Sequence, residues 1–433
     1  MTTLEHSIVM GGSMAGLLAA AALAPHSARV TIVDRDALPV DGPDAFAPRR
    51  GVPQGGTVHR LLALGEARME ELLPGLREEL LAAGAVPRAA READTVLDEA
   101  TPNAGAPAAA DGPLGTGESA AAPGIDEPGT LWLTRPVLEG VVRRRVLALP
   151  GVEAVQGAVG GLLTSDDKRT VTGVQLRGGE VDELHGDLVV DAAGRSSRAA
   201  TWVEGLGFKR PRTLGTRVHV AYTSQRLRLR EGAMPEGAES LGQPATGNNP
   251  FTIDLEPCGA DEHILSIAGT ARHQPPTDLE GLLDMVALLP ERETADALDS
   301  ALEGAEPVGE PSVAKAAGAH RQLWEERTDG PAGLVHIGDS AAMFTPLYGQ
   351  GMAMAAVGAV ALRDTLADDG ADGLAARFAR LLGALLDRAW EITTSRDAQI
   401  PGAEMLVDGA VVEELPAAGS LVGAGQSTGE TLR

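Results

Sequence analysis

The chain has 433 residues, 43% of them hydrophobic, and a formal net charge of −25 at pH 7. This length predicts two or three compact units of ~150 residues, and the charge argues against nucleic acid or an anionic membrane surface as a partner. Cys258 is the only cysteine, which excludes an internal disulfide and cysteine-based metal centres, and the nine histidines show no metal-ligand spacing. We therefore expect no bound metal. We find no signal peptide and no apolar run near the ~18 residues of a membrane span, so we expect a cytoplasmic protein.

The first 36 residues predict a β-α-β unit. Residues 7–11 are typical of a buried parallel strand, residues 14–24 of a helix and residues 28–36 of a second strand. The acidic residue Asp34 ends the second strand, 23 positions after Gly11, where dinucleotide-binding proteins place a carboxylate on ribose hydroxyls.

The turn between the first strand and the helix is rich in glycine. It matches the pattern G-x-G-x-x-G at Gly11 and Gly16 and has Ser13 at the middle position. We expect Gly11 in a tight turn and Gly16 at a close approach of helix and strand. The backbone N–H groups of Ser13, Met14 and Ala15 are then candidates to face a pyrophosphate.

Asp34 also bears on which dinucleotide is bound. A carboxylate at this position disfavours the 2′-phosphate of NADP, which leaves FAD and NAD open. The neighbouring Arg35 is a candidate contact for the adenine or for a phosphate.

The rest of the chain predicts a mixed α/β protein with several antiparallel segments and two weakly structured stretches. In chain order we expect a loop over 37–59, a helix over 59–84, a mobile loop or lid over 100–130, a strand and helix over 131–149, an antiparallel hairpin over 152–179, a buried strand over 187–194, an antiparallel sheet over 213–272, helices over 278–289 and 293–303, a strand over 333–339, a long helix from about 351, and a loosely attached tail over 402–433.

A second motif, HIGDSAAMFTPLYGQGMAMAA over 336–356, favours a flavin. A strand that ends in Gly338 and Asp339 presents a carboxylate for a ribityl hydroxyl, and Pro346 precedes a helix. The backbone N–H groups at the start of that helix would stabilise negative charge on the N1–C2=O edge of a reduced flavin. These groups belong to Gly349, Gln350, Gly351 and Met352.

These stretches resemble the group A FAD-dependent monooxygenases, the aromatic hydroxylase and epoxidase superfamily, and within it the bacterial polyether-epoxidase branch. The resemblance extends over most of the chain outside 90–130 and the tail. It is carried by GGSMAGLLAA, VDRD, RRGVPQGGTVH, TRPVLEGVVRRR, DLVVDAAGRSSR, LSIAGTARHQPPTDLEGLLDMVALLP and GLVHIGDSAAMFTPLYGQGMAMAA.

The resemblance implies an α/β fold. A Rossmann-like, glutathione-reductase-type FAD domain (1–90, 131–200 and 325–400) would carry an inserted antiparallel-sheet substrate domain (201–324, with the loop 91–130) and C-terminal helices, followed by a tail (401–433). Arg135 would reach FAD near its phosphates and ribityl chain. The loop that would lie against the isoalloxazine contains Arg50, Gly51, Val52, Pro53 and Gln54.

The implied reaction transfers one oxygen atom from a flavin C4a-hydroperoxide to an apolar small molecule. We expect epoxidation or hydroxylation of a polyketide or terpenoid-like natural product in secondary metabolism, because two tyrosines and five phenylalanines are too few for an aromatic pocket. We assign no acid or base; Pro346, Gly349 and Gln350 would position the flavin. The run Asp191-Ala192-Ala193-Gly194 lacks the aspartate of the family's second fingerprint, so NAD(P)H would deliver electrons directly or through a flavin reductase.

Three alternatives remain open at this point. A reductase or oxidase of the same fold would share the nucleotide motifs, as would a non-catalytic FAD-binding protein. A flavin halogenase would need a relay lysine and a Trp-x-Trp-x-Ile-Pro run; that run is absent, and the first lysine, Lys168, lies on the predicted hairpin.

Four further side chains are weaker candidates. His59 either contacts cofactor or substrate or is structural. His219 and Tyr222 lie on one predicted strand with opposite facing, so only one of them is expected to face the pocket. Arg321 is expected to pair with an acidic residue.

Overall fold

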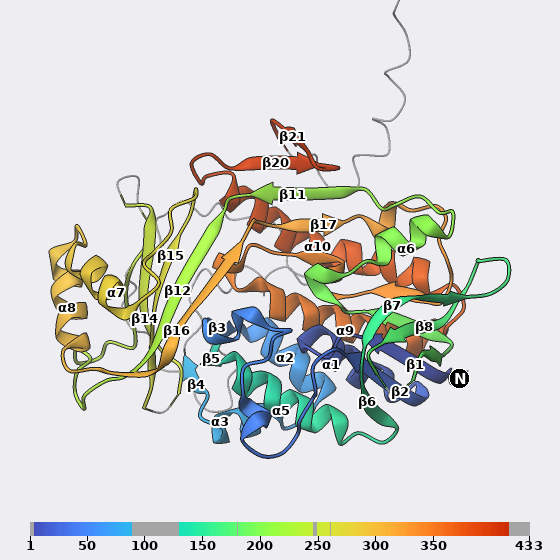
Figure 1. The fold of residues 1–433 in the computed structure, drawn as a ribbon, viewed down its shortest axis with the longest axis horizontal. Coiled ribbons are helices and arrows are strands. Elements are labelled where there is room, and N and C mark those ends of the chain that lie inside the picture. The colour runs from blue at the N-terminus through green and yellow to red at the C-terminus, as the bar shows by residue number, and fades with distance from the viewer. Residues whose placement is uncertain (1–3, 89–129, 180, 246–248, 260, 415–433) are drawn as a thin grey trace, which may run out of the picture.

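The computed structural model describes residues 4–88, 130–179, 181–245, 249–259 and 261–414. The predicted loop over 100–130, except for its last residue, and the end of the predicted tail (415–433) lie outside the described residues. The description that follows therefore concerns the remaining chain, whose elements are labelled in Figure 1.

A parallel five-stranded sheet forms the centre of the larger part of the molecule. Its strand order is β18-β10-β1-β2-β6, and every neighbouring pair runs parallel. Buried apolar residues occupy successive positions of β1 and β10, as expected for a sheet that is covered on both faces. The strands are β1 (Leu4–Met10), β2 (Ser27–Asp34), β6 (Val152–Gln156), β10 (Leu188–Asp191) and β18 (Leu334–His336).

Helices rich in alanine and leucine pack around this sheet. α1 is buried at nine of its ten positions because it contacts the sheet on one side and α9 and α5 on the other. α9 in turn contacts α2 and α10 and lies in the middle of the molecule in Figure 1. These helices are α1 (Met14–Leu23), α2 (Ala63–Leu72), α3 (Leu76–Ala82), α5 (Arg135–Leu147), α6 (Ala199–Gly205), α9 (Gln350–Asp369) and α10 (Leu374–Asp397).

An antiparallel five-stranded sheet forms the second part, on the left of Figure 1. Two short helices, α7 (Leu279–Ala287) and α8 (Arg292–Leu302), cover its outer face and share with it a separate apolar core. The inner face therefore remains turned toward the parallel-sheet part. The strand order is β13 (Leu241–Gln243), β14 (Phe251–Pro257), β15 (His263–Gly269), β12 (Val220–Arg228) and β16 (Glu306–Ala316).

Three smaller sheets complete the described fold. One of them, containing β11 and β17, lies above the helices in Figure 1. Their strand orders are β19 (Ala342–Met343), β17 (His320–Gln322), β11 (Thr213–Arg217), β20 (Glu404–Val407), β21 (Ala410–Val412); β3 (Val58–Leu61), β5 (Thr130–Thr134), β4 (Val86–Arg88); and β7 (Ala158–Thr164), β8 (Val171–Arg177), β9 (Glu183–His185).

The predicted α/β fold with a Rossmann-like parallel sheet is confirmed, and three expected elements are corrected. The helix expected over 59–84 begins only at Ala63 and divides at Pro74 and Gly75, where the positive φ of Gly75 interrupts α-helical geometry. Its first residues instead form β3.

Two of these corrections concern strand pairing. The hairpin expected over 152–179 is formed by β7 and β8, whereas β6 joins the parallel sheet beside β2. The part of the tail over 404–412 is not loosely attached, because β20 pairs with β11 and β21 continues that sheet. Alternation within a segment does not reveal which distant strand will supply its hydrogen bonds.

Candidate functional site

A cavity of about 3020 Å³ lies between the two large sheets. It exceeds the ~300–1,000 Å³ of a typical small-molecule pocket, so it has room for two ligands side by side. Of the residues assigned from the sequence to cofactor binding or to the flavin loop, Gly16 and Val52 do not line it. Those that do are Gly11, Ser13, Met14, Ala15, Asp34, Arg35, Arg50, Gly51, Pro53, Gln54, Arg135, Gly338, Asp339, Pro346, Gly349, Gln350, Gly351 and Met352.

The turn after β1 forms one end of the cavity. Gly11 has φ +103°, and a Cβ there would lie 2.5 Å from the carbonyl oxygen of Ala192. A Cβ on Gly16 would lie 1.8 Å from the carbonyl oxygen of Gly11. Both positions therefore require glycine, one for the turn and one for the close approach of α1 that the spacing predicts.

Ser13 begins α1 and does not leave its hydroxyl free. The hydroxyl donates to Glu139 Oε2 at 2.8 Å and accepts from Arg135 Nη2 at 2.9 Å. The side chain thus anchors the turn to α5. Ser13 therefore contributes to the cavity its small size and its backbone at the N-terminus of α1.

Glu139 is a buried carboxylate that pairs with several arginines, and it was not predicted from the sequence. Arg49 Nε donates to its Oε1 at 2.9 Å, and Arg135 Nε lies 3.3 Å from its Oε2. Burial raises the pKa of this carboxyl, but Arg135 and Arg49 more than offset that effect, so its pKa is below the ordinary value. The i, i+4 spacing of Arg135, Glu139 and Arg143 on α5 was the available signal.

Asp34 lines the cavity and also holds the backbone of the neighbouring turns in place. Its carboxylate accepts from the backbone N–H of Gly12 at 2.7 Å and of Asp36 at 2.8 Å. Arg49 Nη1 lies 3.5 Å from Asp34 Oδ1. A carboxylate has about four acceptor sites, so these contacts orient Asp34 and still leave lone pairs for a ligand.

The second motif forms the middle of the cavity at the start of α9. Gly349, with φ +68°, is the N-cap of this 20-residue helix. Burial raises the pKa of Asp339 above its ordinary value, while Arg135 and Arg195 act in the opposite direction. The amide oxygen of Gln350 accepts from the hydroxyl of Thr393, which fixes this side chain against α10.

His59 lines the cavity from β3 rather than from a helix. Its Nδ1 lies 2.9 Å from the carbonyl oxygen of Thr57, and because a carbonyl only accepts, Nδ1 carries the proton. Burial, aided by Arg135, lowers the pKa of His59 from 6.5 to about 4. The imidazole is therefore neutral at pH 7.

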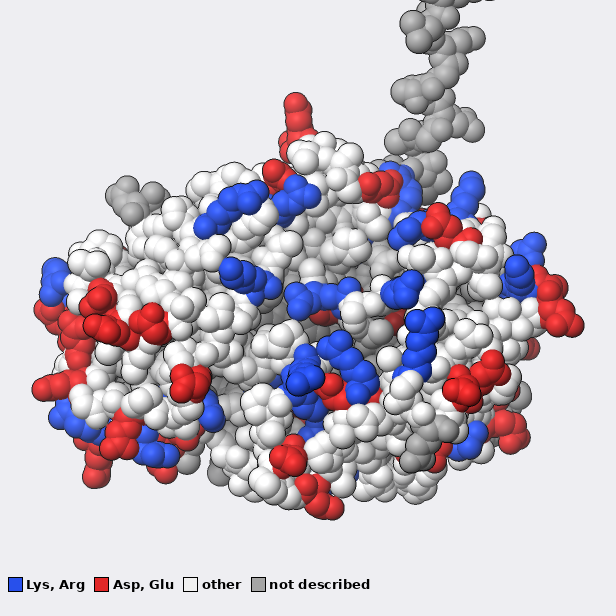
Figure 2. Space-filling view, in the orientation of Figure 1, with Lys and Arg blue, Asp and Glu red and all other residues white. Residues whose placement is uncertain are grey.

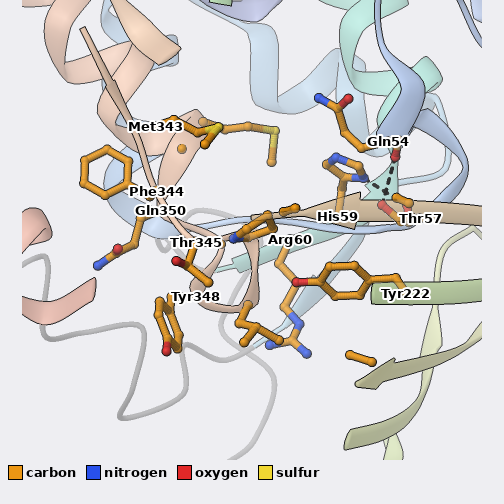
Figure 3. A pocket seen from close by; sticks show the side chains of 18 of the residues that line it. Gln54, Thr57, His59, Arg60, Tyr222, Met343, Phe344, Thr345, Tyr348 and Gln350 are labelled. Carbon is orange, nitrogen blue, oxygen red and sulfur yellow. Dashed lines mark hydrogen bonds between the residues drawn. The ribbon is translucent and has the colours of Figure 1, made fainter. Parts of the chain in front are cut away.

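The antiparallel sheet supplies the wall opposite the segment that carries Thr345 and Tyr348, shown in Figure 3. Tyr222 on β12 lines the cavity, whereas His219 does not. His219 is not on the strand as expected: it precedes β12 with φ +49°, because the backbone turns there before the ladder begins. The expectation that only one of the two faces the cavity is confirmed.

Positive side chains gather around this cavity although the chain is strongly acidic. Eleven of the lining residues are Lys or Arg and seven are Asp or Glu, against 36 and 61 in the whole chain. Figure 2 shows the blue side chains in the middle of this face, around the hollow, and most red ones toward its margins. A cleft lined in this way attracts anionic ligands.

The remaining predicted features lie away from the chemistry. Arg321 is buried and pairs with Glu325 at 2.6 Å and Asp387 at 2.8 Å, as expected.

Among the described residues, no cluster of three His, Cys, Asp or Glu side chains has the geometry to hold a metal. Within the same part of the chain, no helix combines the length and apolarity that crossing a membrane requires.

One curated protein is clearly related to this chain. Protein Rv3254 of Mycobacterium tuberculosis (strain ATCC 25618 / H37Rv) is 32% identical over 371 residues, which are 84% of this chain and 73% of that protein. No model of a known protein family matches the chain.

Solved structures share the fold. The flavin-dependent brominase Bmp2 matches with a TM-score of 0.59 at 14% identity, over 91% of this chain and 85% of that one. The tetrameric form of 2-methyl-3-hydroxypyridine-5-carboxylic acid oxygenase matches with a TM-score of 0.58 at 17% identity, over 93% and 94%. A brominase and an oxygenase use this one fold, so the reaction has to be argued from the site.

Proposed function

The chain belongs to the family of Protein Rv3254 of Mycobacterium tuberculosis, and we propose that it is an FAD-dependent monooxygenase. The observation that carries this proposal is the continuity of the cavity. One space joins the glycine turn at Gly11, the start of α9 at Gly351 and the antiparallel sheet at Tyr222. A dinucleotide and a second molecule can therefore meet inside it.

The start of α9 fits the ring end of a flavin. A Cβ on Gly349 would meet no atom within 4 Å, and a Cβ on Gly351 would meet only Asp339 Oδ1, at 4.0 Å. No side chain fills the space beside these glycines, and the free N–H groups of a helix N-terminus stabilise negative charge. This end suits a flat ring that becomes anionic when reduced.

The turn after β1 fits the phosphate end. The backbone of Ser13, Met14 and Ala15 lines the cavity at the start of α1, with Arg135 and Arg50 beside it. Asp34, beside the turn, would supply carboxylate oxygens for the ribose hydroxyls, and Asp339 would supply them for the ribityl hydroxyls. The donor set therefore fits FAD, with Arg35, Val52 and Gln54 on the neighbouring segments.

When bound and reduced by the electron donor, FAD would supply the two electrons with which one atom of O₂ enters the substrate and the other leaves as water. The chain's own residues position the reactants and exclude water. Pro346, Gly349 and Gln350 hold the ring, and the sheet wall holds the substrate. We propose a bulky apolar substrate of polyketide or terpenoid type that is hydroxylated or epoxidised, as in the epoxidase branch.

NAD(P)H is the proposed electron source, either directly or through a flavin reductase. The positive lining of the cavity supports an anionic donor. We further propose that residues 1–90, 131–200 and 325–400 form the FAD-binding unit and that residues 201–324 form the substrate unit.

A reductase or oxidase of the same fold is the second candidate, because the FAD-binding features would be the same. Halogenation is less well supported. A halogenase needs a relay lysine in the cavity, and Lys168 and Lys209 do not line it. Lys315 lines the cavity, but it is exposed and donates to Gln274 at 2.9 Å.

Purified protein tests the proposal in two steps. We expect FAD to be released on denaturation, and Gly351→Leu to lose it while remaining folded, because a leucine side chain at this position would occupy the open space beside α9. Gly205→Leu is the matched control, since a Cβ there meets nothing within 4 Å and lies outside the cavity.

The second step follows the oxygen atom. Protein reduced with NADH or NADPH is mixed with ¹⁸O₂ and a panel of polycyclic and long-chain alkenes and ketones. A product carrying one ¹⁸O atom supports the monooxygenase. A product without ¹⁸O indicates the reductase or oxidase, a bromide-dependent product indicates the halogenase, and failure to bind FAD refutes all of them.

A further inference from the structure

Tyr222 and Tyr348 are the only tyrosines in the chain, and both line the cavity. Their hydroxyl groups differ in one respect. The hydroxyl of Tyr348 donates to Asp397 Oδ1 at 2.9 Å. The hydroxyl of Tyr222 is buried and has no hydrogen-bond partner among the described residues.

Tyr222 is held rigidly by the sheet that bears it. It lies in β12 between two antiparallel neighbours, opposite Ala268 of β15 and Ala314 of β16. Because both flanking strands pair with β12, its backbone cannot turn the ring away from the cavity without breaking the ladder. Figure 3 shows the ring projecting from the sheet toward the segment that carries Thr345 and Tyr348.

The opposite wall offers this hydroxyl no acceptor. Asp397 on α10 is fully buried and accepts from the hydroxyl groups of Thr345, at 2.6 Å, and of Tyr348 and Thr216. These three donors occupy three of the about four acceptor sites of the carboxylate, and the Tyr222 hydroxyl makes no hydrogen bond to it. Tyr222 therefore remains the phenol whose hydrogen-bonding capacity is unused.

A buried hydroxyl without a partner is unfavourable by about 1–3 kcal/mol, so such groups in proteins are usually completed by a ligand or by water. The residues around Tyr222 are small: Ala268, Ala314 and Ala316 line the same wall. The same wall also carries the polar residues Thr252, Asp254 and Ser266. Among these wall residues, Tyr222 is the one with a buried hydroxyl that has no hydrogen-bond partner.

We propose that Tyr222 determines specificity by hydrogen-bonding an oxygen atom of the substrate, so that the enzyme selects bulky apolar molecules that already carry a carbonyl or hydroxyl group. The inference rests on the proposed function and narrows its substrate class. An earlier oxygenation or a polyketide-type synthesis is the class of reaction that would supply such a molecule.

The substrate is unidentified, so the test uses two probes that differ in one oxygen, androstan-17-one and androstane. Their dissociation constants are measured on the FAD-loaded protein by tryptophan fluorescence, since Trp132 and Trp202 line the cavity. We expect the ketone to bind about 5- to 20-fold more tightly than the hydrocarbon, and Tyr222→Phe to abolish the difference. Equal affinities for the wild type, or a ketone that does not bind, would overturn the proposal.

A measurement without any ligand provides the second arm. Tyr222→Phe removes an unpartnered hydroxyl and should leave Tm unchanged or raised, whereas Tyr348→Phe removes a hydrogen bond to Asp397 and should lower it. A comparable drop in Tm for both variants would show that the Tyr222 hydroxyl has an internal partner and would overturn the proposal. FAD content, measured in parallel, reports separately on the proposed function.

Discussion

Protonation of His59 should weaken the folded state at mildly acidic pH. The folded-state pKa of about 4 lies below the ordinary value of 6.5, chiefly because the ring is buried. The folded protein therefore binds fewer protons at this site than the unfolded chain. The stability that this histidine contributes is fully present above pH 6.5 and is lost as the pH falls from 6.5 toward 4.

The size of the effect follows from the two pKa values. A pKa difference of one unit corresponds to about 1.36 kcal/mol, so the shift from 6.5 to about 4 limits the total loss to roughly 3 kcal/mol below pH 4. Between pH 8 and pH 5.5 only the unfolded chain becomes protonated to a large extent, which gives a loss on the order of 1 kcal/mol.

The assay compares urea unfolding of the wild type and of His59→Asn at pH 8 and pH 5.5. Asparagine keeps a donor for the carbonyl of Thr57 but does not titrate. We expect the wild type to lose on the order of 1 kcal/mol more than the variant over this interval. His185→Asn, at a side chain that is 72% exposed, controls for the substitution itself. An identical pH dependence for wild type and His59→Asn would refute the reasoning.

Three further predictions concern the turn after β1 and its support. Gly16→Ala should lower Tm and should weaken FAD binding at least tenfold, because its Cβ would lie 1.8 Å from a backbone oxygen. Gly205→Ala, where a Cβ meets no atom within 4 Å, should change neither quantity. Ser13→Gly should destabilise by about 1 kcal/mol yet bind FAD within a fewfold of the wild type, since it removes a bond to Glu139 and no backbone donor; a tenfold loss of affinity would instead make the hydroxyl a ligand. Glu139→Gln should destabilise by about 3–5 kcal/mol in urea unfolding, because buried arginines lose their counter-charge; a loss below 1 kcal/mol would contradict this.

Local features of the structure could be predicted well from the chain alone. The β-α-β unit, the requirement for glycine at positions 11 and 16, and the acidic end of β2 depend on backbone geometry within a few dozen residues. The long helix after Pro346 was predicted for the same reason, since short-range periodicity and turn residues determine such elements.

Contacts between distant segments could not be predicted in this way. Arg49 and Glu139 are 90 positions apart, and Thr216 and Asp397 are 181 positions apart, so no spacing rule connects them. The engagement of the Ser13 hydroxyl by Glu139 and the pairing of β6 with β2 belong to the same class. Each arises only when packing brings separate elements together.

The amino-acid sequence was therefore sufficient for the α/β fold class and for the two glycine-rich turns, because those depend on local sterics and hydrophobic periodicity. The tertiary structure decided which side chains have free atoms inside the cavity. The hydroxyl of Ser13 and the amide oxygen of Gln350 are engaged by neighbours, whereas the hydroxyl of Tyr222 is not. The reason is that hydrogen-bonding capacity is consumed by whatever lies nearest in space, and proximity in space is set by the packing of whole sheets and helices.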